Sequence, residues 1–146
     1  MKTRTLLSVV ISSLVLVLMQ LNASAADHPH YLQALSDLRG ARWMIDHRTG
    51  DWKQTDDEIA AVHHIDLAIN EIIKASIDDG KLPKDHPRVD ERPDHIGRLH
   101  EAFDFLQRAR KDVNQEEDDS FANGLKNRAI VHISEAMKFT QHAIKA

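Results

Sequence analysis

The sequence predicts an all-α protein, an up-down-up-down four-helix bundle built from two repeated helical hairpins. Two observations lead to this fold class. Four segments carry apolar residues with the period of a helix, and the two halves of the chain resemble each other at an offset of 68 residues. Polar connections separate the segments, and residues 1–25 stand apart from them.

The first expected helix spans about residues 30–48. Its apolar stripe consists of Tyr31, Ala34, Leu35, Leu38, Ala41 and Ile45. The second expected helix spans about residues 55–79, where Thr55 and Glu58 form a capping-box pattern and Gly80 follows as a C-terminal signal. Its apolar face consists of Ile59, Val62, Ile65, Ile69, Ile72, Ile73 and Ile77.

The third expected helix spans about residues 95–114, with Asp94 as its N-cap. The stripe of this helix consists of Leu99, Ala102, Phe103, Leu106, Ala109 and Val113. The fourth spans about residues 119–145 and completes hairpin 2 (about 94–145), while the first two helices make hairpin 1 (about 30–79). We expect the polar, proline-containing linker 80–93 to run along the outside of the bundle.

The internal repeat needs no gap across either hairpin loop. It pairs Ala34 with Ala102, Leu38 with Leu106, Ala61 with Ala129, His64 with His132 and Ile65 with Ile133. One hairpin cannot bury its own apolar face, so we expect the two copies to pack together as one domain over residues 26–146.

Residues 1–25 have the pattern of a secretory signal peptide. Lys2 and Arg4 precede an uncharged apolar run, and Ala23-Ser24-Ala25 is a small-x-small cleavage pattern. The run is shorter than the roughly 20 residues of a membrane span. We expect cleavage after Ala25 and a periplasmic or secreted product without integral membrane association; an uncleaved anchor is the alternative.

Composition excludes several classes of function. Removal of residues 1–25, which hold two basic and no acidic residues, takes the formal charge from −4 to −6, which argues against nucleic acid as a partner. The absence of cysteine excludes disulfides, thiolate metal sites and a thiol nucleophile. The sequence also lacks a zinc-protease motif, a Glu-x-x-His pair, a nucleophile elbow and a phosphate-binding glycine loop. We therefore expect no enzyme.

Ten histidines, all after residue 25, point instead to metal chemistry. With cleavage after Ala25 the chain begins Ala26, Asp27, His28. Its amine, two amides and one imidazole form the square-planar nitrogen set that suits Cu(II) or Ni(II). A start at Asp27 would remove this site, and a frayed terminus with a chance histidine is the alternative.

A second candidate metal site lies on the hairpins. Antiparallel pairing within hairpin 2 sets His132 near Asp104, and His100 lies one turn before Asp104. Two imidazoles and a carboxylate are a minimal Zn(II) or Cu(II) set. In the first copy His64 stands at the corresponding position, near Asp37. The alternative is that His64 and His132 are boundary residues bonded to carboxylates without metal.

Arg42 and Arg110 fall on the apolar stripes of their helices. A core-facing arginine needs a carboxylate or carbonyl partner, and Glu58 is the expected partner of Arg42. We interpret these arginines as anchors of helix register, with an anionic ligand pocket as the alternative.

Residues 28–43, reading HPHYLQALSDLRGARW, resemble a group of small exported bacterial four-helix-bundle proteins of unknown function. Residues 97–100, 115–118 and 128–136 resemble later segments of that group, so the resemblance covers the mature chain. It implies location and fold more than activity. The group is expected to have histidine where this chain has Gln33. A looser resemblance is to small His-rich periplasmic metal-binding proteins.

Two functional hypotheses follow. The first is a periplasmic, non-catalytic bundle that binds or buffers a divalent metal, Cu(II), Ni(II) or Zn(II), through its histidines. The second is a periplasmic bundle that binds a protein or small ligand without metal, with Leu32 and Trp43 as exposed contacts.

Overall fold

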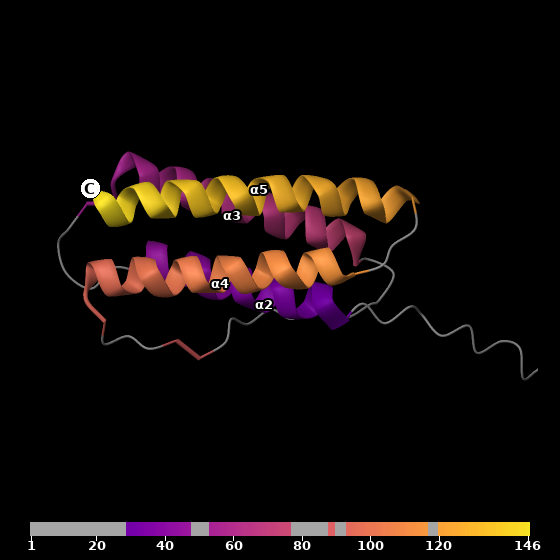
Figure 1. Ribbon diagram of the computed structural model, residues 1–146, viewed down its shortest axis with the longest axis horizontal. Coiled ribbons are helices and arrows are strands. Elements are labelled where there is room, and N and C mark those ends of the chain that lie inside the picture. Colours follow the sequence, from indigo (N-terminus) through magenta and orange to yellow (C-terminus); the bar gives the residue numbers. More distant parts are fainter. Residues whose placement is uncertain (1–28, 48–52, 77–87, 90–92, 117–119) are drawn as a thin grey trace, which may run out of the picture.

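The computed structural model describes residues 29–47, 53–76, 88–89, 93–116 and 120–146. These residues form four helices and no strand: α2 (Pro29–Asp46), α3 (Asp56–Ala75), α4 (His95–Gln115) and α5 (Ser120–Lys145). The helices lie alongside one another along the long axis of the molecule (Figure 1). Within the described part of the chain, no helix has the length and apolarity to cross a membrane. The four packed helices confirm the predicted all-α four-helix bundle.

Local side-chain chemistry sets the helix starts. Thr55 Oγ1 accepts a hydrogen bond from the Glu58 N–H at 3.2 Å, and Glu58 Oε2 accepts one from the Thr55 N–H at 2.7 Å, which completes the expected capping box. Asp94 accepts from the Gly97 N–H at 2.8 Å as the N-cap of α4. Helix α3 ends at Ala75, earlier than the expected position near 79. Gly80 lies outside the described residues.

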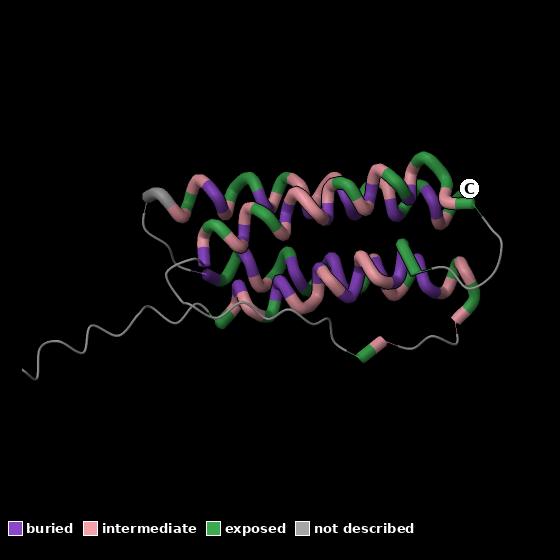
Figure 2. The backbone as a smooth tube through the Cα atoms, turned by 180° about the vertical axis from the view of Figure 1, so that it is seen from behind, coloured by how far each residue is buried: buried purple, intermediate pink, exposed green. Residues whose placement is uncertain are grey.

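Each helix has a buried face along its length (Figure 2), and small and branched apolar residues make up most of these faces. The residues predicted for the apolar stripes of the first and third helices are buried, with one exception. Phe103 is only partly buried, and Phe105 belongs to the core in its place. On α3, Ile59 is 53% exposed and does not belong to the core. Alanines recur on the buried faces of all four helices, and these small side chains let the helices approach closely.

The contacts at the helix ends fix the direction of each helix. Arg98, in the first turn of α4, donates to the carbonyl of Met44 near the end of α2, and the His30 N–H at the start of α2 donates to Glu116 at the end of α4. Helices α2 and α4 are therefore antiparallel neighbours. Arg128 of α5 likewise contacts Glu71 near the end of α3, so α3 and α5 are antiparallel neighbours.

The order of directions along the chain is therefore up-down-down-up, which differs from the expected up-down-up-down order. Figure 1 shows α2 and α5 running one way and α3 and α4 the other. The connection from α3 to α4 must consequently return along the bundle. Helix α3 has 20 residues and is about 30 Å long, whereas the residues from 76 to 94 can reach about 60 Å when extended. Val89 of this connection packs against the core.

Because the chain returns along the bundle between α3 and α4, each helix of hairpin 2 runs antiparallel to its repeat equivalent in hairpin 1. The two hairpins are then related by an approximate twofold axis perpendicular to the bundle, and residues related by the 68-residue offset exchange places. Gly40 of α2 lies against Phe105 of α4, and the corresponding contact, with the positions exchanged, joins Arg108 to Asp37 at 3.3 Å. One contact is apolar packing and the other is an ion pair, although symmetry makes them equivalent.

Candidate functional site

The approximate twofold axis brings two equivalent histidines together. His64 of α3 and His132 of α5 place their Nδ1 atoms 3.3 Å apart. Each precedes a fully buried isoleucine, Ile65 or Ile133, so each lies at the edge of the core where α3 packs against α5. Both side chains are half-buried, which leaves the pair accessible from solvent.

Aromatic packing holds the pair in place. The ring of Phe139 stacks on His64 with centroids 5.6 Å apart and planes 13° apart. His63 approaches His64 edge-on at the same centroid separation, and it is exposed. The repeat equivalent of Phe139 is Glu71, so His132 lacks the corresponding aromatic neighbour. His64 is consequently the more tightly packed ring of the two.

The surroundings of His64 disfavour its charged form. Partial burial lowers the pKa of His64 below its ordinary value of 6.5, the nearby His132 and His63 lower the pKa further, and Glu135 opposes them. His64 is therefore neutral at neutral pH. A neutral imidazole can donate from one nitrogen and accept at the other, and it is also the form that binds metal ions.

The structure does not assemble the three-residue metal site expected on hairpin 2. His132 turns toward α3 and meets His64, whereas His100 and Asp104 are exposed on α4. Across the described ranges, no three His, Cys, Asp or Glu side chains converge as a metal-binding group. The other predicted ligands, Ala26, Asp27 and His28, lie outside these ranges.

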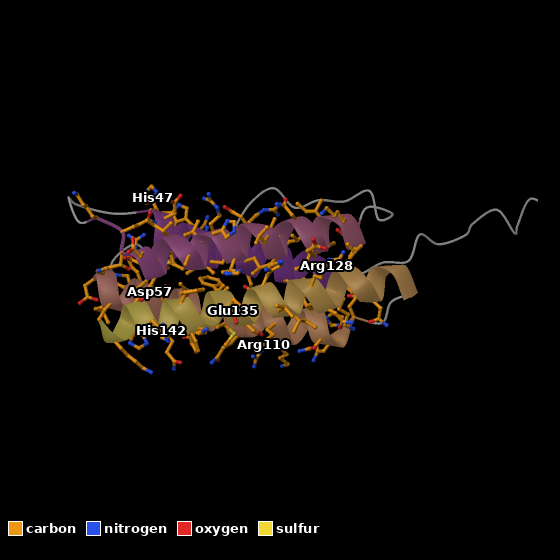
Figure 3. All side chains as sticks on the ribbon, turned by 90° about the horizontal axis from the view of Figure 1, so that it is seen from above. His47, Asp57, Arg110, Arg128, Glu135 and His142 are labelled. Atoms are coloured by element: carbon orange, nitrogen blue, oxygen red, sulfur yellow. The ribbon has the colours of Figure 1, made fainter. Side chains whose placement is uncertain are left out.

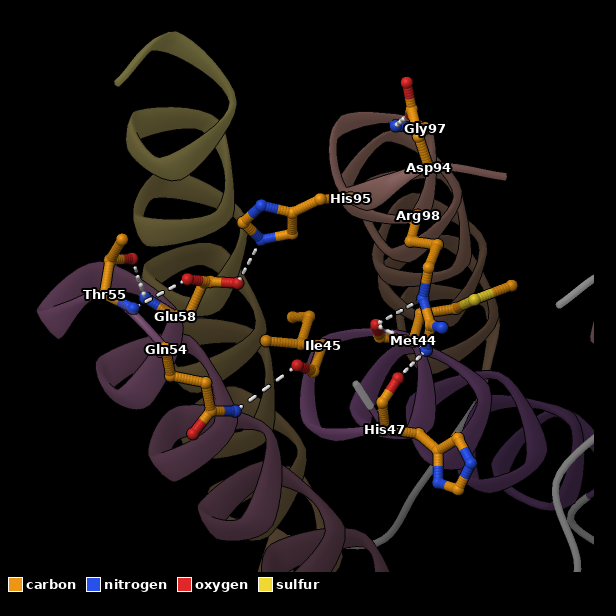
Figure 4. Close-up of polar contacts among 10 residues, drawn as sticks. All are labelled: Met44, Ile45, His47, Gln54, Thr55, Glu58, Asp94, His95, Gly97 and Arg98. Atoms are coloured by element: carbon orange, nitrogen blue, oxygen red, sulfur yellow. Dashed lines mark hydrogen bonds and ion pairs between the residues drawn. The ribbon is translucent and has the colours of Figure 1, made fainter. Parts of the chain in front are cut away.

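A second polar cluster closes one end of the bundle (Figure 4). Glu58, 1% exposed, lies 2.6 Å from Nε2 of His95. Arg98, also 1% exposed, donates to the carbonyls of Met44 and His47. Burial acts to raise the pKa of Glu58, but hydrogen bonds from Thr55 and His95 outweigh it and hold that pKa below 4.5. The cluster joins the end of α2 to the starts of α3 and α4.

The buried arginine is therefore not one of the two predicted. Arg42 is half-buried and pairs with Asp66 at 2.8 Å and with Asp46 at 3.1 Å, and its expected partner Glu58 is bonded elsewhere. Arg110 is exposed. Arg98 was not singled out from the sequence. Its burial could have been inferred from its position, because it lies four residues before Ala102 and therefore on the same buried face of α4.

The two residues proposed as exposed contacts are less exposed than expected. Trp43 packs against the core, stacks on the ring of His47 with centroids 4.4 Å apart, and lies under the guanidinium of Arg98 at 5.1 Å. Leu32 is half-buried. Trp43 therefore belongs to the packing of the bundle end.

Comparisons with protein-family models, curated proteins and solved structures found no match. The geometry of the chain's own residues is therefore the guide to its function, and the contact between the repeat-equivalent His64 and His132 is its most distinctive feature.

Proposed function

We propose that this chain is an exported, non-catalytic bundle that binds a divalent transition metal ion through His64 and His132. The observation that carries the proposal is the Nδ1–Nδ1 distance of 3.3 Å. Zinc–imidazole bonds of about 2.0–2.1 Å, meeting at a tetrahedral angle, place two nitrogens about 3.3–3.4 Å apart. The two nitrogens, which are within hydrogen-bond distance of each other, thus already have the spacing that a bridging ion requires, and such an ion would replace their direct contact.

The chemistry of the pair favours Zn(II) or Cu(II). Imidazole nitrogen is a preferred ligand of both ions, whereas Mg(II) and Ca(II) prefer oxygen. The lowered pKa of His64 keeps a nitrogen lone pair available at neutral pH. Structural zinc sites take four protein ligands, so a pair of ligands on one chain predicts reversible binding. Reversible binding suits an ion buffer better than a permanent structural metal.

Export and the N-terminal tripeptide remain parts of this proposal. Cleavage after Ala25 would place the protein outside the cytoplasm and would create the Cu(II) or Ni(II) site of Ala26, Asp27 and His28. That site requires a free amine and is independent of the bundle. Mass measurement of the exported protein tests it, and a chain that begins at Asp27 would exclude it.

The experiment on the bundle site begins with metal-free protein carrying His28→Ala, which removes the N-terminal site. Titration with Zn(II) by calorimetry, and with Co(II) by visible absorption, measures affinity and coordination geometry. His64→Ala and His132→Ala should each weaken binding by roughly a hundredfold or more, since even residues that only support a ligand contribute 10–100-fold. His63→Ala is the matched control, because His63 is exposed beside the pair.

Two results would contradict the proposal. The first is an absence of Zn(II), Co(II) and Cu(II) binding by the His28→Ala protein, which would leave the alternative of a ligand- or protein-binding bundle without metal. The second is an equal loss of affinity in His63→Ala, because this would place the ion on the exposed ring.

A further inference from the structure

We propose that the His64–His132 pair is half of a metal site and that a second copy of this chain supplies the other half. This inference rests on the proposed function. It adds a specific partner and a stoichiometry of one ion to two chains.

The pair offers fewer ligands than a zinc ion needs. Zinc in proteins takes three or four protein ligands, and the described residues offer two at this position. His63 and Glu135 are the nearest further candidates, and neither joins the pair in a three-ligand group. Two coordination positions of a bound ion would therefore face outward from the seam between α3 and α5.

The symmetry of the bundle suits a second copy of the chain. The approximate twofold axis passes between His64 and His132, because they are repeat equivalents in direct contact. The four ligand atoms of a tetrahedral site form a tetrahedron, and each of its twofold axes passes through the ion and the midpoints of two opposite edges. A second chain that approaches along the same axis would place its own pair on the opposite edge of the tetrahedron. The result is a closed, isologous dimer with four imidazole nitrogens around one ion.

The surface around the pair has an exposed apolar part. Beside His132, α5 has a shallow apolar depression of about 370 Å³ lined by Asn127, Arg128, Val131 and His132. Val131 is 59% exposed, more than the exposed Ile59 and Ile96 elsewhere in the described residues. An apolar side chain next to a half-complete site would gain burial on dimer formation.

Charged side chains on this face form ion pairs within one chain. Arg128 pairs with Glu71 at 2.9 Å, and Lys138 pairs with Glu135 at 3.6 Å. In Figure 3, Arg128 lies toward one end of α5, Glu135 near its middle, and His142 close to Asp57 at the other end. These internal pairs lower the electrostatic cost of bringing two such faces together, which favours a second copy over a strongly charged partner.

The test is the molar mass of the His28→Ala protein in solution, measured by sedimentation or light scattering during Zn(II) titration. We expect a monomer in chelator, a dimer that is complete at half an equivalent of Zn(II), and return to monomer when chelator is added. His132→Ala should remain monomeric at every ratio, and His63→Ala should dimerise like the parent.

Val131→Glu provides a second variant that keeps both histidines. It should bind Zn(II) but require at least tenfold more protein to dimerise, because a carboxylate must be desolvated at the interface. A monomer saturated by one equivalent of Zn(II) would overturn the dimer and leave the proposed function standing. A dimer that persists in chelator, or in His132→Ala, would also overturn it. An absence of Zn(II) binding would overturn both proposals.

Discussion

The close approach of α2 to α4 at Gly40 makes a strong prediction about stability. A Cβ atom at Gly40 would lie 2.9 Å from Cε1 of the Phe105 ring and 3.1 Å from Cδ1 and Cζ. Phe105 is 8% exposed, and the guanidinium of Arg108 covers its ring at 4.4 Å. The ring therefore has little room to move away from a new methyl group.

Gly124 of α5 offers the matched control. A Cβ atom there would meet only the tip of Arg128, at 3.7 Å. Replacing a helical glycine with alanine gains up to about 1 kcal/mol of helix propensity at either position. Overpacking a core costs about 1–3 kcal/mol, and this cost applies to Gly40 alone. We expect Gly124→Ala to stabilise and Gly40→Ala to be about 1–3 kcal/mol less stable than Gly124→Ala.

Urea unfolding followed by far-ultraviolet circular dichroism measures this difference. At about 4 °C per kcal/mol, thermal unfolding should separate the two variants by roughly 4–12 °C. Phe105→Leu in the Gly40→Ala background should recover part of the loss, because the smaller side chain makes room. Equal stabilities of the two alanine variants, or no coupling between positions 40 and 105, would refute the account of this contact.

Two further predictions concern the polar clusters. Arg98→Met should cost about 2–4 kcal/mol in urea unfolding, because the carbonyls of Met44 and His47 lose their donor in a buried place. Arg98→Lys should cost less, because lysine keeps the charge and N–H donors, and equal losses in the two variants would contradict this reasoning. Since the pKa of folded His64 lies below 6.5, the unfolded chain takes up a proton first as the pH falls. Stability should therefore be full above pH 6.5 and decline below it, and His64→Gln should flatten that decline in unfolding curves between pH 5 and 8.

Much of the fold follows from the sequence because its signals are local. The alternation of leucine, isoleucine and alanine at helical spacing predicts the core, and the Thr55–Glu58 and Asp94 caps predict where α3 and α4 begin. The direction of hairpin 2 does not follow. A repeated hairpin can pack its apolar face against its copy in either direction, and the connection between the hairpins is long enough for both. Contacts that form only in the folded chain, such as Arg98 with the carbonyl of Met44, fix which ends meet.

The candidate site depends on the direction in which hairpin 2 packs against hairpin 1. In an up-down-up-down order α3 and α5 would lie on a diagonal of the bundle, and His64 and His132 would not share a surface seam. The sequence identified the two residues as repeat equivalents, but it could not show that they touch. Arg98 was missed for a related reason, because its role is to bond the end of α2, which becomes its neighbour only through the same crossover.

The crossover between α3 and α4 also has a consequence for assembly. It links two hairpins that would otherwise have to find each other by diffusion, and a covalent link between two modules gives an effective concentration that reaches the millimolar range. A chain cut between residues 80 and 88 would exchange that intramolecular encounter for a bimolecular one. The stability of the resulting pair of fragments would then depend on their concentration, as it does for an obligate dimer.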